Sequence, residues 1–389
     1  TSTDVVYNLK TNSSFPVKVT GNHPMYVRKL HVERLRKYKD GIDTTRRVLG
    51  NPEWKAVEEL EVGEHYVGIP INKESVIPKN NNFQLPFEKE SFWWIVGRYI
   101  GDGWTELAKR KRKNGIVLSK GVIICSTKKD ESEKEVITEQ LNRAGFDFWV
   151  EEANTTYKIH INKCNDLYDY LQTFGKYAHG KHLNKDVLSL PKKLLSAFFE
   201  GYMSADGHYI KAKDLYSFKT ASKELAIGLM QVVNKVFNRP TSIYVLPKKT
   251  ETIDGRVVQS KEKYEIKFYK TKRVNREKSF CEDGYIWSRI SSLDKEIESQ
   301  SMYNLTVLDD SSYVVHGLAA HNCGYIISPA AVSEFVPQAT VLNKETKERD
   351  TVTQYTMGEC EEVGLLKMDF LGLRTMGVID SVIQEANEK

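Results

Sequence analysis

The chain has 389 residues, enough for about two to four domains, and its 40% hydrophobic, 11% aromatic and 28% charged residues are typical of a globular protein. No run approaches the roughly 18 apolar residues of a membrane span, which excludes a membrane protein. The 5 cysteines form no CxxC pair, so neither a disulfide framework nor a cysteine zinc site is expected, and the sequence predicts a protein of the reducing cytoplasm.

The net charge of +5 is divided unevenly along the chain. Residues 323–389 hold 6 of the 57 Lys and Arg residues and 11 of the 52 Asp and Glu residues. Residues 1–322 therefore hold 51 basic and 41 acidic residues. Residues 107–129 contain no acid, and their basic residues are Lys109, Arg110, Lys111, Arg112, Lys113, Lys120, Lys128 and Lys129. Further basic clusters follow residue 27 and residue 248. Because like charges repel unless an anion neutralises them, three clusters favour binding to nucleic acid.

The first part of the chain predicts short strands. Residues 1–27 contain two apolar runs around a turn at Asn12, and residues 54–71 continue as strands around Gly63. The Pro- and Asn-rich residues 78–86 are typical of a linker. A second domain is therefore expected to begin near residue 88.

In that second domain helices alternate with strands, and the order occurs twice. An apolar helix is predicted over 91–103, strands at GIVLS and GVIICS, and a helix over 130–143, in which Glu133 is placed for a capping box. The order returns as an apolar helix over 194–207, a strand at YSFKTA and a helix over 222–237. The pattern predicts two similar half-domains built from αββ units.

Both apolar helices carry small residues at helical spacing. Gly97 and Gly101 are four residues apart in the first helix, as are Gly201 and Ala205 in the second. Residues at this spacing share one face of a helix. The two faces can therefore meet at close range.

Each of these helices ends in an aspartate. Asp102 and Asp206 are each followed by a glycine that can stop the helix in the left-handed conformation. A helix C-terminus already concentrates negative charge, so a carboxylate there is unfavourable. If the helices pack as partners, the two carboxylates need a cation, and oxygen ligands favour Mg²⁺. The arrangement predicts metal-assisted hydrolysis of a phosphodiester.

The helix motifs IVGRYIGDG (95–103) and FEGYMSADG (199–207) resemble the two signature helices of LAGLIDADG homing endonucleases. The resemblance implies that Asp102 and Asp206 are the catalytic, metal-binding carboxylates. It also implies that a saddle of strands carrying the basic clusters lies in the major groove of double-stranded DNA.

The same resemblance implies a lysine before the second helix. Lys181 in GKHLN is the best match, with Asn184 where the family usually has proline, and Lys185 is the alternative. A counterpart for the other half is Lys272 or Lys278, and the sequence does not choose between them.

Two short motifs flank the endonuclease-like region: Thr-x-x-His at 20–23 and His-Asn-Cys at 321–323. The side-chain amide of Asn322 can attack its own carbonyl and cut the chain, provided that a neighbour such as His321 protonates the leaving nitrogen. The Cys323 thiol can hold an acyl group as a thioester before that step.

These flanking segments, residues 1–75 and 291–322, resemble an intein. The resemblance implies the β-horseshoe of Hedgehog/intein (HINT) domains. It also implies that Thr20 and His23 assist an N-to-S acyl shift, and that Cys323 accepts the acyl group as first extein residue before the preceding asparagine cyclises.

The chain departs from the intein pattern in three ways. The family's first nucleophile should lie several dozen residues before Thr20, so it is expected in a missing N-terminal part of the same precursor. By itself the chain is then expected at most to cleave after Asn322. Asn304 and Ser311 stand where the family commonly has Asp and His, and loss of that imidazole is expected to slow the C-terminal step.

The acidic C-terminal part resembles a third family. CGYIISPAAVSEFVP and TQYTMGECEEVGLLKMDFLGLRTMGVI are similar to the palm region of bacterial DNA polymerase III alpha subunits. The resemblance implies that Asp369, in KMDFLGL, binds Mg²⁺ for nucleotidyl transfer. It also implies the replication machinery as partner of the spliced polymerase.

Together the motifs predict a fragment of a replicative polymerase precursor. An all-β HINT domain over 1–77 and 291–322 is expected to be split by an α+β endonuclease of two αββαββα-type repeats over 88–290, followed by an α/β palm segment over 323–389. Two alternatives stay open. One is a degenerate intein that splices without cutting DNA, and the other is a protein that only binds DNA.

Overall fold

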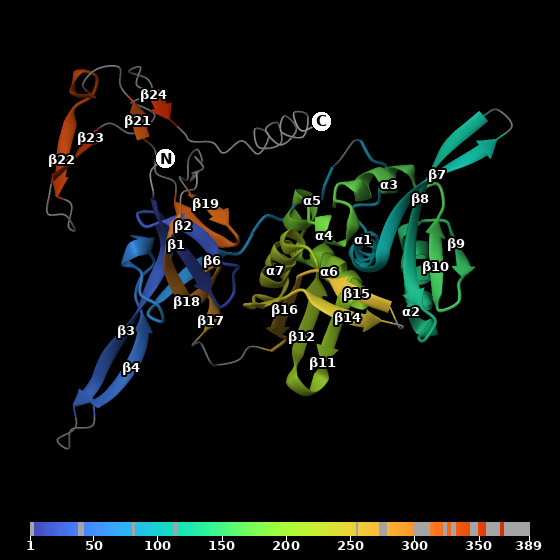
Figure 1. Cartoon of the computed structure of the whole chain (residues 1–389), viewed down its shortest axis with the longest axis horizontal. Helices are drawn as coiled ribbons and strands as arrows, with labels where there is room; N and C mark the ends of the chain where they lie inside the picture. Colours follow the sequence, from blue (N-terminus) through green and yellow to red (C-terminus); the bar gives the residue numbers. More distant parts are fainter. Residues whose placement is uncertain are drawn as a thin grey trace.

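The computed structural model describes residues 4–37, 43–79, 82–112, 115–253, 256–271, 278–298, 312–321, 325–327, 332–342, 349–354 and 366–368. The described residues of 4–79 and 278–321 form one unit, here called the sheet unit, and those of 82–271 form the helical unit beside it (Figure 1). No helix in this part of the chain is long and apolar enough to cross a membrane.

The sheet unit is a 10-stranded sheet with the central order β19-β20-β3-β6-β18-β1-β2. Its strands are β1 (Asp4–Thr11), β2 (Val17–Thr20), β3 (Pro24–Lys37), β4 (Asp43–Leu49), β5 (Glu53–Ala56), β6 (His65–Pro70), β17 (Ser279–Glu282), β18 (Tyr285–Glu298), β19 (Ser312–Val315) and β20 (Leu318–His321). β1 pairs with β18, and β20 pairs with β3. Strands from before and after the helical unit therefore share one sheet.

The helical unit contains seven α-helices among its described residues. They are α1 (Glu90–Asp102), α2 (Glu131–Ala144), α3 (Asn165–Gln172), α4 (Tyr177–Gly180), α5 (Lys185–Ser189), α6 (Lys192–Asp206) and α7 (Lys223–Phe237). Its strands are β7 (Gly103–Arg112), β8 (Gly115–Thr127), β9 (Phe148–Glu152), β10 (Thr156–Ile161), β11 (Gly207–Ile210), β12 (Leu215–Thr220), β13 (Ser242–Leu246), β14 (Lys249–Ile253), β15 (Arg256–Ser260) and β16 (Lys263–Tyr269).

The internal repeat expected from the sequence is present. Each half has a four-stranded antiparallel sheet, in the orders β7-β8-β10-β9 and β11-β12-β16-β13. The β14–β15 hairpin is inserted between β13 and β16 in the second half only. The segments GIVLS and GVIICS, expected as two strands, form the single strand β8 because Lys120 and Gly121 continue the ladder with β7.

The helix termini follow their capping residues. The Asp130 carboxylate accepts from the backbone N–H of Ser132 at 3.0 Å at the start of α2. The predicted capping box is not formed, because Glu133 accepts from the backbone N–H of Thr127 at 2.9 Å instead of bonding back to Asp130. α7 begins similarly, with Ser222 Oγ accepting from the backbone N–H of Leu225.

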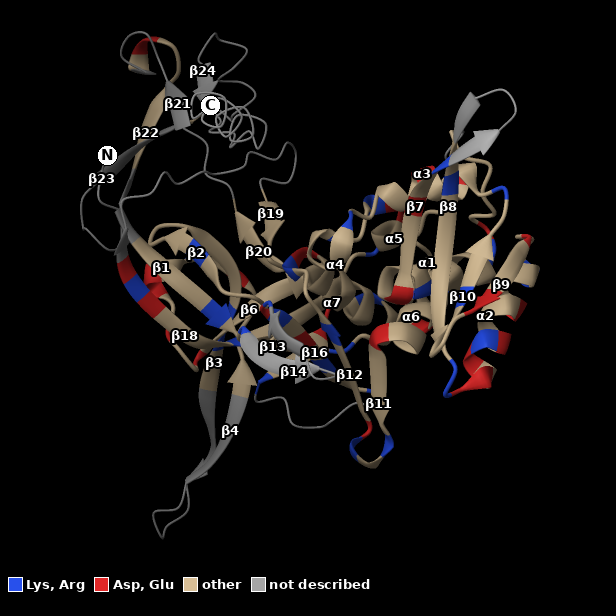
Figure 2. Cartoon of the chain, turned by 45° about the vertical axis from the view of Figure 1, so that its right-hand side comes forward, with Lys and Arg blue, Asp and Glu red and all other residues tan. Residues whose placement is uncertain are grey.

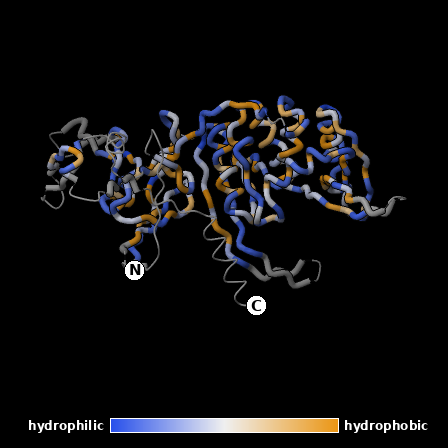
Figure 3. Tube along the Cα trace, turned by 90° about the horizontal axis from the view of Figure 1, so that it is seen from above, coloured by the Kyte–Doolittle hydropathy of each residue, from blue (hydrophilic) through white to orange (hydrophobic). Residues whose placement is uncertain are grey.

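Each unit has its own core, and hydrophobic segments lie in both units (Figure 3). The core of the helical unit contains α1, α6, α7 and one face of both four-stranded sheets, so it buries large aromatic side chains such as Trp93, Phe198 and Phe218. Phe15 of the sheet unit also joins this core and meets Tyr264 edge to face at 5.4 Å. This contact ties the two units together.

Four short strands follow the sheet unit. They are β21 (Tyr325–Ile327), β22 (Gln338–Leu342), β23 (Arg349–Thr353) and β24 (Leu366–Met368). β21 pairs with β24, and β22 pairs with β23, both antiparallel. These two pairs and a single 3₁₀ turn, η3 (Val332–Glu334), are the secondary structure described for the segment expected to form a polymerase palm.

Candidate active site

Helices α1 and α6 pack against each other along their small residues. A Cβ atom on Gly97 would overlap the carbonyl oxygen of Phe198, and one on Gly201 would overlap that of Trp94. A Cβ on Gly101 would overlap the Cβ of Ala205. The helices can approach this closely only because these positions carry no larger side chain.

This packing brings the C-terminal ends of both helices together. Asp102 and Asp206 are the last residues of α1 and α6. The glycines that follow were expected to be left-handed, but they are not. Gly103 has φ −112° and Gly207 has φ −97°, because each chain leaves its helix directly into an extended strand.

The two carboxylates differ in their electrostatic environment. The Asp206 side chain reaches solvent, but protein atoms surround much of it. This partial burial raises its pKa to about 6, and the charge of Asp102 is the second cause of the increase. Lys181 and Arg98 oppose this increase. Two like charges held close together in this way are favourable sites for a cation.

Arg98 is a residue of the site that sequence reasoning missed. Its side chain is fully buried, and Nη2 lies 3.3 Å from Asp102 Oδ2 and 2.5 Å from Glu133 Oε1. Nη2 also donates to the Cys125 carbonyl at 2.8 Å, and Nη1 donates to the Ser204 carbonyl. An arginine in the middle of an apolar helix was the available signal, since such a residue is buried only with partners.

Lys181 occupies the site, whereas its alternative Lys185 does not, and Lys278, one of the two candidates for the counterpart lysine of the other half, lies in the sheet unit. Its Nζ donates to the Ile100 carbonyl at 2.6 Å, and burial lowers its pKa although both aspartates favour its charged form. Lys185 is exposed at the start of α5. Lys278 lies next to β17 in the sheet unit, and its carbonyl accepts from the backbone N–H of Arg289. Lys272 is outside the described residues.

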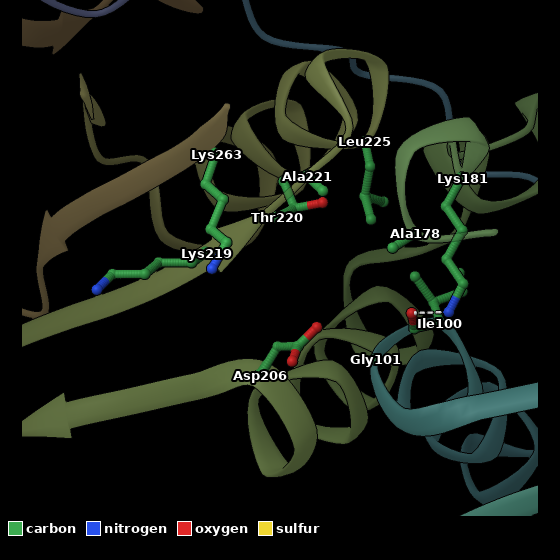
Figure 4. Close-up of a pocket in the computed structure, with 10 residues that line it drawn as sticks. All are labelled: Ile100, Gly101, Ala178, Lys181, Asp206, Lys219, Thr220, Ala221, Leu225 and Lys263. Carbon is green, nitrogen blue, oxygen red and sulfur yellow. Dashed lines mark hydrogen bonds between the residues drawn. The ribbon is translucent and has the colours of Figure 1, made fainter. Parts of the chain in front are cut away.

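A cavity of about 350 Å³ opens at Asp206. Its lining residues are Ile100, Gly101, Ala178, Lys181, Asp206, Lys219, Thr220, Ala221, Leu225 and Lys263. Figure 4 shows the Asp206 carboxylate between Lys181 on one side and Lys219 and Lys263 on the other. Lys219 and Lys263 were not predicted, because they come from β12 and β16 and meet only through the sheet.

The donor set of this site fits a hard divalent cation that also binds substrate. Among the described residues there is no group of three or more His, Cys, Asp or Glu side chains placed to hold a metal. Mg²⁺ commonly takes one or two protein carboxylates and completes its shell with water and phosphate oxygens. Burial, followed by the charge of Asp102, raises the pKa of Asp206, so a cation bound there would stabilise its charged form.

The basic residues predicted to bind DNA are not equivalent in the structure. Lys120 Nζ lies 2.6 Å from both carboxylate oxygens of Asp169, and Lys128 Nζ lies 2.6 Å from Glu152. Lys109 and Lys129 are exposed. Arg110, Lys111 and Arg112 belong to β7, and Lys113 lies outside the described residues. Basic and acidic residues are interleaved over both units (Figure 2).

The flanking motifs meet in the sheet unit. The His23 imidazole Nε2 lies 3.2 Å from the Tyr313 hydroxyl, and the His23 backbone N–H donates to the Thr20 carbonyl. Burial, followed by the charge of His321, lowers the pKa of His23. His321 packs edge to face against Trp54 at 5.2 Å. Sequence reasoning missed Tyr313, because its partner is 290 residues away.

Several predicted residues have no structural description. Asn322 and Cys323 of the splice motif, Asp369 of the polymerase-like segment, and the substituted positions Asn304 and Ser311 lie outside the described residues.

A family model for the bacterial DNA polymerase III alpha NTPase domain matches residues 248–372. The match includes most of the segment expected to be polymerase and begins within the residues expected to form the endonuclease. The chain thus contains a region related to DNA polymerase III alpha.

Curated DNA polymerase III alpha subunits are similar over part of the chain. The subunit from Xylella fastidiosa is 33% identical over 101 residues, which are 26% of this chain and 8% of the relative. The subunit from Aquifex aeolicus is 48% identical over 56 residues, 14% of this chain and 4% of the relative. The chain therefore spans less than a tenth of the length of these relatives.

Solved structures that are similar to this one include two homing endonucleases. One is I-DmoI in complex with DNA and Ca, at a TM-score of 0.30 and 17% identity, covering 46% of this chain and 82% of that chain. The other is I-WcaI bound to its DNA recognition sequence, at a TM-score of 0.29 and 14% identity, covering 46% of this chain and 76% of that chain. TM-scores of this size are too low to support an argument.

Proposed function

We propose that the helical unit is a metal-dependent, site-specific DNA endonuclease of the LAGLIDADG type. The observation that supports this proposal best is the pair of carboxylates, Asp102 and Asp206, at the adjoining ends of two closely packed helices. Burial, followed by the charge of Asp102, raises the pKa of Asp206 to about 6, and a cation bound there would offset both effects.

In this proposal Asp102 and Asp206 hold the divalent cation, and Mg²⁺ bound there supplies activation of water and stabilisation of the leaving oxygen. The lysines of the cavity act on the phosphate. Lys181, Lys219 and Lys263 line the same cavity as Asp206, so they can contribute to neutralising a phosphodiester and the additional charge of its transition state. Arg98 holds Asp102 in place through its contact with Oδ2.

The substrate we propose is double-stranded DNA carrying the polymerase III alpha gene without the insertion. A plasmid with that junction sequence, incubated with the full chain and Mg²⁺, should be linearised. Asp102→Asn and Asp206→Asn should each abolish cutting while the duplex is still bound, as measured by gel shift. A chain that binds the junction but never cuts it would favour the alternative of DNA binding without cleavage.

A second candidate function is self-processing by the sheet unit as part of an intein. Strands from residues 4–70 and 279–321 form one sheet across the helical unit, as expected for a domain interrupted by an insertion. In the proposed step the side-chain nitrogen of Asn322 attacks its own carbonyl carbon. The peptide bond to Cys323 breaks, and its nitrogen takes a proton, for which His321 is the neighbouring imidazole.

Intact mass after incubation at neutral pH tests this step. Release of a fragment beginning at Cys323 from the full chain, and not from Asn322→Ala, would support it. If the mass does not change, a peptide that carries the N-terminal nucleophile block of an intein should be added in trans. A chain that stays whole under both conditions has no self-processing activity.

The third part of the proposal concerns the polymerase-like segment. The match to the DNA polymerase III alpha model over residues 248–372 supports a polymerase-like segment here. We propose that residues 323–389 are an extein fragment and that Asp369 contributes to a Mg²⁺ site. Polymerase activity, the replication machinery as partner and a cytoplasmic location then belong to the spliced product.

A further inference from the structure

The first four-stranded sheet carries a row of side chains that crosses all its strands. In the strand register Trp104 of β7 lies opposite Ile123 of β8, Ile123 lies opposite His160 of β10, and His160 lies opposite Trp149 of β9. Directly opposed residues share a face of the sheet. The row therefore lies on a single face, with an exposed tryptophan on each edge strand, 39% exposed for Trp104 and 49% for Trp149.

This face is the one that the helices leave uncovered. The alternate residues Val122, Ile124 and Ile159 are buried in the core of the helical unit. Side chains of neighbouring residues in a strand point to opposite faces. Ile123 is only 1% exposed but is not part of that core, as expected if its neighbours in the row cover it.

The row is held rigidly before any ligand binds. The rings of Trp149 and His160 are stacked, with centroids 4.0 Å apart and planes inclined by 4°. His160 Nε2 in turn lies 2.9 Å from Glu151 Oε2. A fixed aromatic surface loses little side-chain entropy when it binds.

The second half of the repeat has a polar row at the same positions. Next to the C-terminal end of α6, the residues opposed in register are His208, Ser217, Lys267 and Ser242. None of these four side chains is aliphatic or an indole. The two halves of the repeat therefore differ in chemistry at equivalent places.

We propose that Trp104 and Trp149, the two exposed residues of this row, recognise the 5-methyl groups of thymine in one half of a double-stranded DNA site. His208 and Ser242, the exposed residues of the polar row, read hydrogen-bonding base edges in the other half. This inference rests on the proposed endonuclease function. Thymine methyls are the apolar groups that a sheet meets in the major groove. DNA is the occupant because β7 begins beside Asp102 and continues into the basic residues 109–112.

The test starts from a randomised duplex library selected with the full chain in Ca²⁺ and without Mg²⁺. The wild-type sequence profile is compared with those of Trp149→Ala and of Val150→Ala. Val150 is a matched control, because it is on the same strand, is 39% exposed and lies on the opposite face. In a second experiment with wild-type protein, thymine in the selected duplex is replaced by deoxyuridine, which lacks only the methyl group.

We expect Trp149→Ala to lose a thymine preference in one half-site and to keep the wild-type sequence preference in the other half-site. Val150→Ala should keep the wild-type preference in both half-sites. Deoxyuridine at that position should weaken wild-type binding about fourfold, the equivalent of about 0.8 kcal/mol for one methyl group. A selected site whose binding is insensitive to deoxyuridine, or whose thymine preference survives in Trp149→Ala, would overturn the inference but not the endonuclease. A library that yields no preferred sequence would overturn both.

Discussion

Arg98 and Asp102 lie one turn apart on α1, and the guanidinium Nη2 of Arg98 is 3.3 Å from Oδ2 of Asp102. The arginine side chain is fully buried, whereas the aspartate side chain is 44% exposed at the cavity. The same Nη2 also pairs with Glu133 of α2. One buried cation thus links the Asp102 carboxylate to a neighbouring helix.

Replacing Arg98 by methionine should lower the free energy of unfolding by about 3 kcal/mol, because Glu133 and the Ser204 carbonyl lose their partner inside the protein. Urea unfolding of the metal-free chain measures this change. Arg143→Met is the matched control. Its pair with Glu139 is exposed, so its removal should change stability by no more than about 0.5 kcal/mol. Equal effects of both substitutions would contradict the role given to Arg98.

Gly97→Ala should destabilise the helical unit by about 1–3 kcal/mol, since the new methyl group meets the backbone carbonyl of Phe198, which cannot move aside without shifting α6. DNA cleavage should be lost together with the alignment of the two aspartates. Gly180→Ala provides the control, because a Cβ there has no atom within 4 Å. Melting curves and plasmid cleavage of both variants check the prediction, which fails if Gly97→Ala cleaves normally.

The parts of the fold that could be predicted depend on local sequence. The apolar periodicity over 91–103 and 194–207 predicted α1 and α6 to within about two residues, and Asp130 and Ser222 marked the starts of α2 and α7. The spacing of Gly97 and Gly201 also predicted that the two aspartates would lie at adjoining helix ends. The helices and their ends need only information within one or two helical turns, and the packing of α1 against α6 was indicated because the same small-residue spacing occurs in both helices.

The parts that could not be predicted depend on tertiary pairing. Lys219 and Lys263 meet at the cavity through the β12–β16 ladder, in which Thr220 lies opposite Tyr264. Lys120, which was expected at DNA, also pairs with Asp169 of α3. Neither relationship has a signal in the sequence, since the partners are more than 40 residues apart.

The pKa of Asp206 predicts how stability depends on pH in the absence of metal. A folded-state pKa of about 6, above the unfolded value of 3.8, means that the native chain binds the proton more tightly. Stability contributed by this group is therefore full at low pH and is lost as pH rises from about 4 to about 6. The melting temperature of the wild type relative to Asp206→Asn should fall over that window.

Asp214→Asn is the control of opposite sign. Hydrogen bonds from Thr271 and Tyr209 lower the pKa of Asp214, so its contribution is lost as pH falls. Parallel pH profiles of these two variants relative to the wild type would contradict the assignment for Asp206.

Lys181→Ala should reduce DNA cleavage at least about 100-fold, because its ammonium group is held at the Ile100 carbonyl and interacts electrostatically with both aspartates. Lys185→Ala, four residues on and exposed, should cleave at the wild-type rate. Single-turnover cleavage of the junction duplex separates the two, and a gel shift shows whether binding is retained. Loss of cleavage in Lys185→Ala with normal cleavage in Lys181→Ala would show that Lys185, and not Lys181, is the lysine needed for cleavage.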